Sequence, residues 1–394
     1  MVGPMTIILL LVTALCAAVL LHPGLRRRPL WRATVTPLAS IIGSGFLVLG
    51  PVLVHDFGQA APLVMLILCL LAFGFGASIR ANIQRIGEWP AQDSQAERIS
   101  GWILSVAYMI SVAYYLNLFG AFAVSLSPWD TPLYARLVTS AVYGVILVLG
   151  VWRGFGALEA VEYPAVALKL AVIAALVVAL VWHVGGVVYQ GGNLPLPQAH
   201  IHGWASVTLI FGLIITVQGF ETSRYLGSSY SPRQRIQSMR LAQWVASLVY
   251  VVYVALLTWA VTVPADVISE TEIIDLMGQV APVLALLLVA AALAAQFSAA
   301  VADTGGAGGL LAEVSRRMFS ERQGYLAVVV SGLLLTWVAD VFTIIAIASR
   351  AFALYYAVQC FIAASHAQGR ARAGHGLMAL TGLCAALLGT PVES

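Results

Sequence analysis

The stretch A-S-I-I-G-S-G-F at positions 39–46 interrupts an apolar run that extends over positions 34–54. The run is long enough for a helix that crosses a bilayer, which needs about 20 mainly apolar residues. Two glycines and a serine nevertheless stand at its centre, and glycine lets a backbone unwind and a ligand approach it closely. We therefore predict a helix that is broken in mid-membrane at residues 43–45.

A second interruption follows five apolar segments later, at Gln218-Gly219 inside the run 204–226. Interrupted segments at corresponding positions of two halves of a membrane protein point to a substrate site between them. We therefore predict two repeats of five helices each, 33–183 and 204–365. Because five is an odd number, the second repeat enters the membrane from the opposite face, which makes the repeat inverted.

The composition supports a membrane protein throughout. Hydrophobic residues make up 61% of the chain and charged residues 9%, whereas a soluble domain carries about 25% charged residues. Helices satisfy their own backbone in lipid, so we predict an all-α membrane protein with about twelve transmembrane helices. The apolar segments lie at 5–21, 34–54, 61–79, 102–126, 132–151, 161–183, 204–226, 241–263, 279–302, 324–339, 341–365 and 376–390.

The ten-helix core, 33–365, is therefore flanked by an extra helix and a basic loop in 1–32 and by one helix in 366–394. The first segment has no positive charge before it, unlike a cleavable signal peptide. We interpret it as an uncleaved helix that spans the membrane, with packing at the membrane interface as the alternative. The ninth segment is expected to continue as helix to Arg317.

Basic residues fix the predicted orientation. Short cytoplasmic loops of membrane proteins carry an excess of arginine and lysine. Most of the 20 basic residues fall on alternate loops, and acids occupy the opposite ones. The basic loops contain Arg26, Arg27, Arg28, Arg32, Arg80, Arg85, Arg98, Arg153, Arg224, Arg233, Arg235, Arg240, Arg316, Arg317, Arg322, Arg370 and Arg372. This alternation predicts a multi-pass protein of the inner (cell) membrane with both termini extracytoplasmic.

Several function classes are not indicated. The four cysteines lie inside apolar runs without metal-ligand spacing, and His200 and His202 stand two apart in a loop. No nucleotide-binding or catalytic motif occurs. We therefore expect no enzyme, catalytic residue, metal or cofactor, and no nucleic-acid partner. The expected partners are a small-molecule substrate, protons and the lipid bilayer. The oligomeric state is left open.

Four short motifs resemble those of the amino acid–polyamine–organocation (APC) transporters. The I-G-S-G at 42–45 resembles that family's break in helix 1, and the G-F-E at 219–221 resembles its helix 6 motif. Pro232-Arg233 resembles its P-x-R loop, and Leu168-Lys169-Leu170 its helix 5 motif. The chain departs from the family pattern in having Val217 where an aromatic residue is usual. It also lacks acids shortly after residue 221 and a twelfth core helix.

The resemblance implies the leucine-transporter-type fold and a secondary active transporter of an amino acid or related amine. Transport by alternating access would be driven by protons or by exchange. One alternative is a nucleobase or other heterocycle carrier on the same fold, in which Gln218 reads the ring edge. Another alternative is a membrane scaffold or sensor that transports nothing. Buried charges argue against a scaffold, because they are costly in a membrane.

The predicted substrate site lies between the two breaks. Amide groups freed by the first break attract an anion such as a carboxylate, and unwound carbonyls at the second receive an ammonium group. Tyr108, Ser111 and Tyr115 share one helical face, and Tyr108 is predicted to line the pocket. The candidate substrate-binding residues are Ile42, Gly43, Ser44, Gly45, Gln218, Gly219, Phe220 and Tyr108.

Lys169 is the leading candidate for ion coupling, since it is the only lysine in the chain. Arginine stays charged, whereas a buried lysine can lose its proton. In the family that this chain resembles, a helix 5 lysine can replace a bound cation. Protonated Lys169 would then contact carbonyls near 40–42 and Ser298. Asp303 and Glu221 are further coupling candidates, with structural pairing as the alternative; for Glu221 the partner would be Arg224. Arg350 is predicted to be a buried cation that gates the outer cavity.

Overall fold

The computed structural model describes residues 4–43, 45–87, 95–153, 159–227, 229–264 and 268–393. Within these ranges the regular secondary structure is entirely helical, with no strand, so the predicted helical class is confirmed. The α-helices are α1 (Pro4–Leu21), α2 (Pro23–Arg26), α3 (Pro29–Ile41), α4 (Gly45–Phe57), α5 (Ala61–Ile86), α6 (Gln95–Val124), α7 (Pro132–Arg153), α8 (Glu159–Tyr189), α9 (Trp204–Gly212), α10 (Pro232–Ala260), α11 (Glu272–Val280), α12 (Pro282–Val314), α13 (Glu321–Val338), α14 (Val341–His366) and α15 (Gly369–Leu388). Three 3₁₀ turns join them: η1 (Gly58–Ala60), η3 (Ile214–Val217) and η4 (Phe220–Tyr225).

Nine helical stretches of the described chain are long and apolar enough to cross a membrane. This confirms a multi-pass membrane protein, while the count of twelve crossings stays a prediction. The helix over the ninth apolar run ends at Val314, earlier than expected, and Arg316 and Arg317 beyond it have positive φ angles. The short helix α11 was not predicted, because its nine residues are too few for a membrane span.

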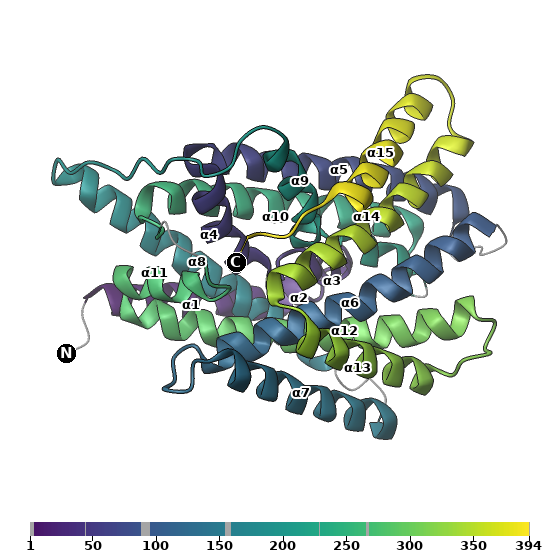
Figure 1. Cartoon of the computed structure of the whole chain (residues 1–394), viewed down its shortest axis with the longest axis horizontal. Helices are drawn as coiled ribbons and strands as arrows, with labels where there is room; N and C mark the ends of the chain where they lie inside the picture. Colours follow the sequence, from purple (N-terminus) through teal and green to yellow (C-terminus); the bar gives the residue numbers. More distant parts are fainter. Residues whose placement is uncertain are drawn as a thin grey trace.

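The first predicted break is present. Helix α3 ends at Ile41 and α4 begins at Gly45, and Ser44 between them lies outside the described residues. Both half-helices lie in the interior of the molecule, where α3 packs against α8, α10, α12 and η4. Figure 1 shows this broken pair surrounded by the longer helices. The break therefore lies in the protein core, where irregular backbone is tolerated at membrane depth.

The second predicted break is also present. Helix α9 ends at Gly212, η3 follows, and Gln218 and Gly219 belong to no helix before η4 begins at Phe220. Gly219 has a φ angle of 114°, a left-handed backbone conformation that favours glycine. The segment thus changes direction at the point where the sequence has its glycine.

The two flanking regions pack on the core in different ways. Helix α1 lies along α8, and the Tyr163 hydroxyl donates a hydrogen bond to the Leu20 carbonyl oxygen at 2.6 Å. Helix α15 packs against α14, and the chain after it runs back across the molecule (Figure 1). There the Thr390 amide donates to the Thr208 carbonyl of α9 at 3.0 Å. The C-terminal segment therefore covers the helix that leads into the second break.

Candidate functional site

The two helix breaks lie in direct contact with each other. A Cβ atom added to Gly219 would lie 2.6 Å from the Ser40 carbonyl carbon and 2.7 Å from the Ile41 amide nitrogen. A Cβ atom added to Gly45 would lie 3.2 Å from the Thr216 Cα. The expectation that the breaks face each other across a cavity is therefore wrong in this conformation. Glycine is required at 219 because the two backbones approach so closely.

One tyrosine of α10 joins the carbonyl groups of both breaks. The Tyr250 hydroxyl lies 2.9 Å from the carbonyl oxygen of Ile41 and 2.6 Å from that of Thr216. These oxygens belong to the ends of α3 and η3, where helical carbonyls lack partners within their own helix. Tyr250 is buried, so its hydroxyl satisfies groups that water does not reach.

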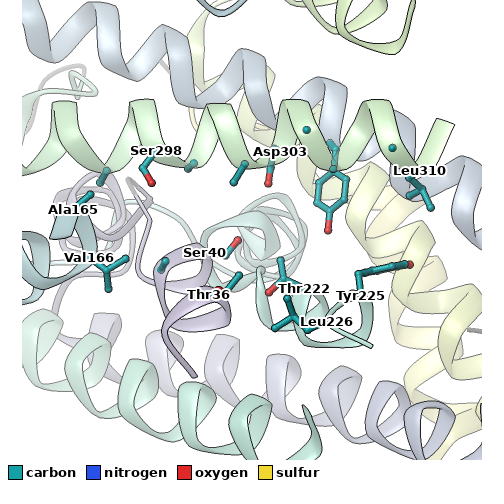
Figure 2. A pocket seen from close by; sticks show the side chains of 18 of the residues that line it. Thr36, Ser40, Ala165, Val166, Thr222, Tyr225, Leu226, Ser298, Asp303 and Leu310 are labelled. Carbon is teal, nitrogen blue, oxygen red and sulfur yellow. The ribbon is translucent and has the colours of Figure 1, made fainter. Parts of the chain in front are cut away.

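A cavity of about 370 Å³ lies beside this contact, between α3, α8, η4 and α12. Its deep part contains Lys169, Ser298 and Asp303, and it extends to Glu313, which is exposed. Figure 2 shows Ser298 and Asp303 on one side of the space, and Ser40, Thr36 and Thr222 on the other. The cavity thus reaches the surface near the arginine-rich loops, because Leu226 and Gly227 next to Arg224 also line it.

Lys169 contacts the first half of the broken helix 1. Its Nζ donates a hydrogen bond to the carbonyl oxygen of Ala39 at 2.7 Å, and the residue is 6% exposed. Ala39 belongs to the last turn of α3, where the helix dipole favours a cation. The predicted contact with this backbone is therefore present, one residue before the predicted range. Ser298 lines the same cavity.

Asp303 and Tyr108 meet in the same cavity. The Ser111 hydroxyl donates a hydrogen bond to Oδ2 of Asp303, and it also lies 2.9 Å from the Tyr108 carbonyl oxygen. Asp303 makes no ion pair with any described residue, so the alternative of an arginine partner does not hold within these ranges. Tyr108 lines the cavity as predicted. Gly305, Gly306 and Gly309 bring the α12 backbone to the cavity wall.

Glu221 lies behind the cavity and is fully buried. Its Oε2 accepts hydrogen bonds from the Gly219 amide at 2.9 Å and from the Tyr356 hydroxyl at 2.8 Å. Its Oε1 accepts none from the described residues. The carboxyl group therefore joins the second break to α14.

Arg224, which we had considered as a partner of Glu221, pairs with another acid. It donates to Glu97 of α6 at 2.6 Å and to the Gln359 side chain of α14 at 2.7 Å. Glu97 also accepts from Arg85 of α5 at 3.1 Å. This polar cluster joins η4 to three long helices at the arginine-rich end of the molecule.

Several predicted substrate residues lie outside the large cavity. Ile42 is buried at the end of α3, and Gly43 borders a separate void of about 10 Å³. Gln218 is buried and donates through Nε2 to the Tyr115 hydroxyl at 2.9 Å. Phe220 stacks on Tyr356 with 5.1 Å between ring centroids. None of these four residues lines the large cavity.

The interpretation of Arg350 as a buried cation is wrong. Its side chain is exposed, and one guanidinium nitrogen donates to the Leu387 carbonyl oxygen at 2.7 Å. Leu387 stands in the last turn of α15, where carbonyls lack helical partners and attract cations. Arg350 therefore binds the end of α15, just before the C-terminal segment that covers α9. A cation of this length can reach out of an apolar region, which the sequence position alone does not reveal.

The sequence reasoning missed five polar residues of the cavity wall: Thr36, Ser40, Thr222, Tyr225 and Glu313. Thr36 and Ser40 are four residues apart on α3, so they share one face of the helix. Their pairing in an otherwise apolar segment was an available signal. Thr222 follows Gly219 by three residues, and its hydroxyl donates to the Gly219 carbonyl at 2.7 Å.

Comparison with known proteins agrees with this arrangement. Residues 23–390 match the family described as APC superfamily transporters. The chain is also 41% identical over 353 residues to a protein of Aquifex aeolicus (strain VF5) described as uncharacterized, covering 87% of this chain and 86% of the relative. The family match confirms the prediction of a transporter rather than an enzyme. The chain belongs to the APC superfamily of transporters.

Proposed function

We propose that the protein is a secondary active transporter that carries an amino acid or related amine by alternating access. The observation that carries this proposal is the cavity of about 370 Å³ beside two interrupted helices. Pockets for small organic ligands start at about 300 Å³, so the volume suits a substrate of this class. Hydroxyl groups and the carboxyl groups of Asp303 and Glu313 line it, and these can bind a polar solute.

The architecture that we propose is a five-plus-five inverted repeat. Residues 33–183 form the first repeat and 204–365 the second, with 1–32 and 366–394 as flanking regions. Two helix breaks at corresponding places of the two repeats support this division. Movement of the broken helices against α6 and α12 would then open the site to each side in turn.

The orientation follows from the positive-inside rule. The arginine-rich loops would be cytoplasmic, and both termini extracytoplasmic. The cavity then opens toward the cytoplasm, since it reaches the surface beside Leu226 and Glu313. On the opposite side, the C-terminal segment after α15 covers α9, and Arg350 binds the end of α15. We propose that Arg350 acts in outer gating through this contact.

Protons or exchange would drive transport, with Lys169 as the coupling group. Its hydrogen bond to Ala39 ties α8 to the last turn of α3. Loss of the proton would weaken this contact and let the inner half of the broken helix move. We assign further roles in ion coupling to Ser298, Asp303 and Glu221.

The cavity proposal is tested by filling the cavity. A Cβ atom at Gly309 meets no atom within 4 Å, and this glycine lines the cavity. Gly309→Phe should therefore leave folding intact while it blocks uptake into proteoliposomes. Gly144→Phe is the matched control, because Gly144 is exposed on α7 and its added Cβ also meets no atom within 4 Å. Unchanged uptake of substrate by Gly309→Phe would contradict the proposal.

The substrate itself is identified by a thermal-shift screen of amino acids, amines and nucleobases. A ligand that binds only the folded protein raises its apparent stability. Each ligand found in this way is then offered to proteoliposomes, with and without a pH gradient. A ligand that binds but is not transported under any of these conditions would contradict the transport function.

A further inference from the structure

We propose, as a refinement that rests on the transport function above, that the substrate is an organic amine without a carboxylate group. Its ammonium group binds to Asp303. The cavity contains a carboxyl group that can bind a cation, and it offers few groups that can bind an anion.

Asp303 is placed to bind a cation. It is 5% exposed, lines the cavity, and in Figure 2 points from α12 into the space opposite Ser40 and Thr222. Ser111 occupies Oδ2, whereas Oδ1 accepts no hydrogen bond from any described residue. An acid in a membrane protein usually faces a partner or a cavity, because its burial is costly. Oδ1 of Asp303 can therefore accept a hydrogen bond from the ammonium group of a substrate.

The remaining charges favour a cation. Glu313 lies at the exposed mouth of the cavity and adds a second acid to the lining. The described lining contains no arginine, the side chain best suited to bind a carboxylate through two hydrogen bonds. Its one lysine, Lys169, donates to the Ala39 carbonyl. The lining therefore carries two acids, Asp303 and Glu313, against one lysine, and this balance favours a cation.

The two described glycines of the predicted carboxylate site, Gly43 and Gly45, do not line this cavity. The break at 43–45 was expected to bind an anion through free amide groups. Gly43 borders the small void, which adjoins the cavity at Lys169 and Ala295, and Gly45 packs against Thr216. A carboxylate in the cavity would thus lie near Asp303, and the two negative groups would repel each other.

The other residues of the cavity lining indicate which kind of hydrocarbon group the amine carries. Val166, Leu226 and Leu310 contribute apolar walls, which suit a hydrocarbon chain. Tyr108 and Tyr225 contribute aromatic rings, and a cation is attracted to the face of such a ring. These surfaces favour an alkylamine or an aromatic amine over a small, strongly hydrated cation.

The test compares amines with the amino acids from which they differ only by the loss of the carboxylate group. Cadaverine is paired with lysine, and isopentylamine with leucine, in thermal-shift titrations and proteoliposome uptake. We expect the amine of each pair to bind at least tenfold more tightly. Asp303→Asn should weaken amine binding about tenfold or more, because hydrogen bonds to charged groups contribute about 1.5–3 kcal/mol. Asp275→Asn is the matched control on the exposed surface of α11 and should bind amines normally.

Two results would overturn the inference while the transport function stands. One is an amino acid that binds and is taken up at least as well as its matched amine. The other is unchanged amine affinity in Asp303→Asn. If that variant does not fold, the wild-type comparison of matched pairs still decides. If purified protein transports neither series nor any other solute in the screen, the transport function itself fails.

Discussion

The Nζ of Lys169 lies 2.7 Å from the carbonyl oxygen of Ala39, so a charged group of α8 holds the last turn of α3 at the edge of the cavity. The same half-helix packs against η4. A change in the charge of one side chain can therefore act on both broken helices.

Lys169→Ala should abolish pH-dependent uptake, because it removes the only side chain in this contact that can exchange a proton. Lys169→Arg should fold and keep a charge there, but it should transport slowly and without pH dependence, since arginine stays protonated. The measurement is uptake into proteoliposomes over a range of pH, with and without sodium. Strict dependence on sodium in the wild type would contradict the assignment.

Gly219→Ala should destabilise the protein by about 1–3 kcal/mol, the usual cost of a strained backbone conformation. Its φ angle of 114° disfavours any side chain, and the added Cβ would lie 2.6 Å from the Ser40 carbonyl carbon. The apparent melting temperature in detergent measures the loss. Gly278→Ala, whose Cβ meets no atom within 4 Å, should melt like the wild type.

The glycines of the first break should differ from each other. Gly45→Val should lower stability as well as binding, because a Cβ atom there lies 3.2 Å from the Thr216 Cα. Gly43→Ala should be tolerated better, since the nearest atom beyond the local backbone is 3.8 Å away, on Tyr115. Melting temperature and ligand affinity, measured together, separate the two effects. Equal stability of both variants would argue against the close contact of the breaks.

Glu97→Gln should lower the free energy of unfolding by about 3–5 kcal/mol, because it leaves the buried guanidinium of Arg224 without a counter-charge. Both side chains are about 5% exposed, so water cannot replace the lost partner. Chemical denaturation or thermal melting in detergent measures the effect. Arg233→Gln, on an exposed position of the same region, is the control and should change stability little. A loss no greater than that of the control would mean that the pair contributes little.

Arg350→Ala should reduce uptake severalfold while expression and melting temperature change little. The side chain is exposed and donates to the Leu387 carbonyl, so its loss frees the end of α15 rather than the core. Arg370→Ala, an exposed arginine at the start of α15, is the matched control. If the protein fails to accumulate instead, Arg350 is needed for folding and has no gating role.

The sequence by itself determined the helical membrane class and the positions of both breaks. Long apolar runs leave helices as the solution for a backbone in lipid, and Gly43, Gly45 and Gly219 mark the places where a helix unwinds. These are local properties, because periodicity, run length and glycine content act on neighbouring residues. The short motifs around 42–45 and 219–221 also sufficed to indicate the family.

Only the tertiary structure decided which polar residues meet. The sequence placed the substrate at the breaks, but their close contact leaves no room there, and the cavity lies beside them. Arg224 pairs with Glu97, which is 127 positions away, and Arg350 reaches α15 rather than the interior. Such contacts depend on the direction of side chains and on the packing of distant helices. The pattern of residues along the sequence determines neither of these. The position of the site therefore depends on how the helices pack.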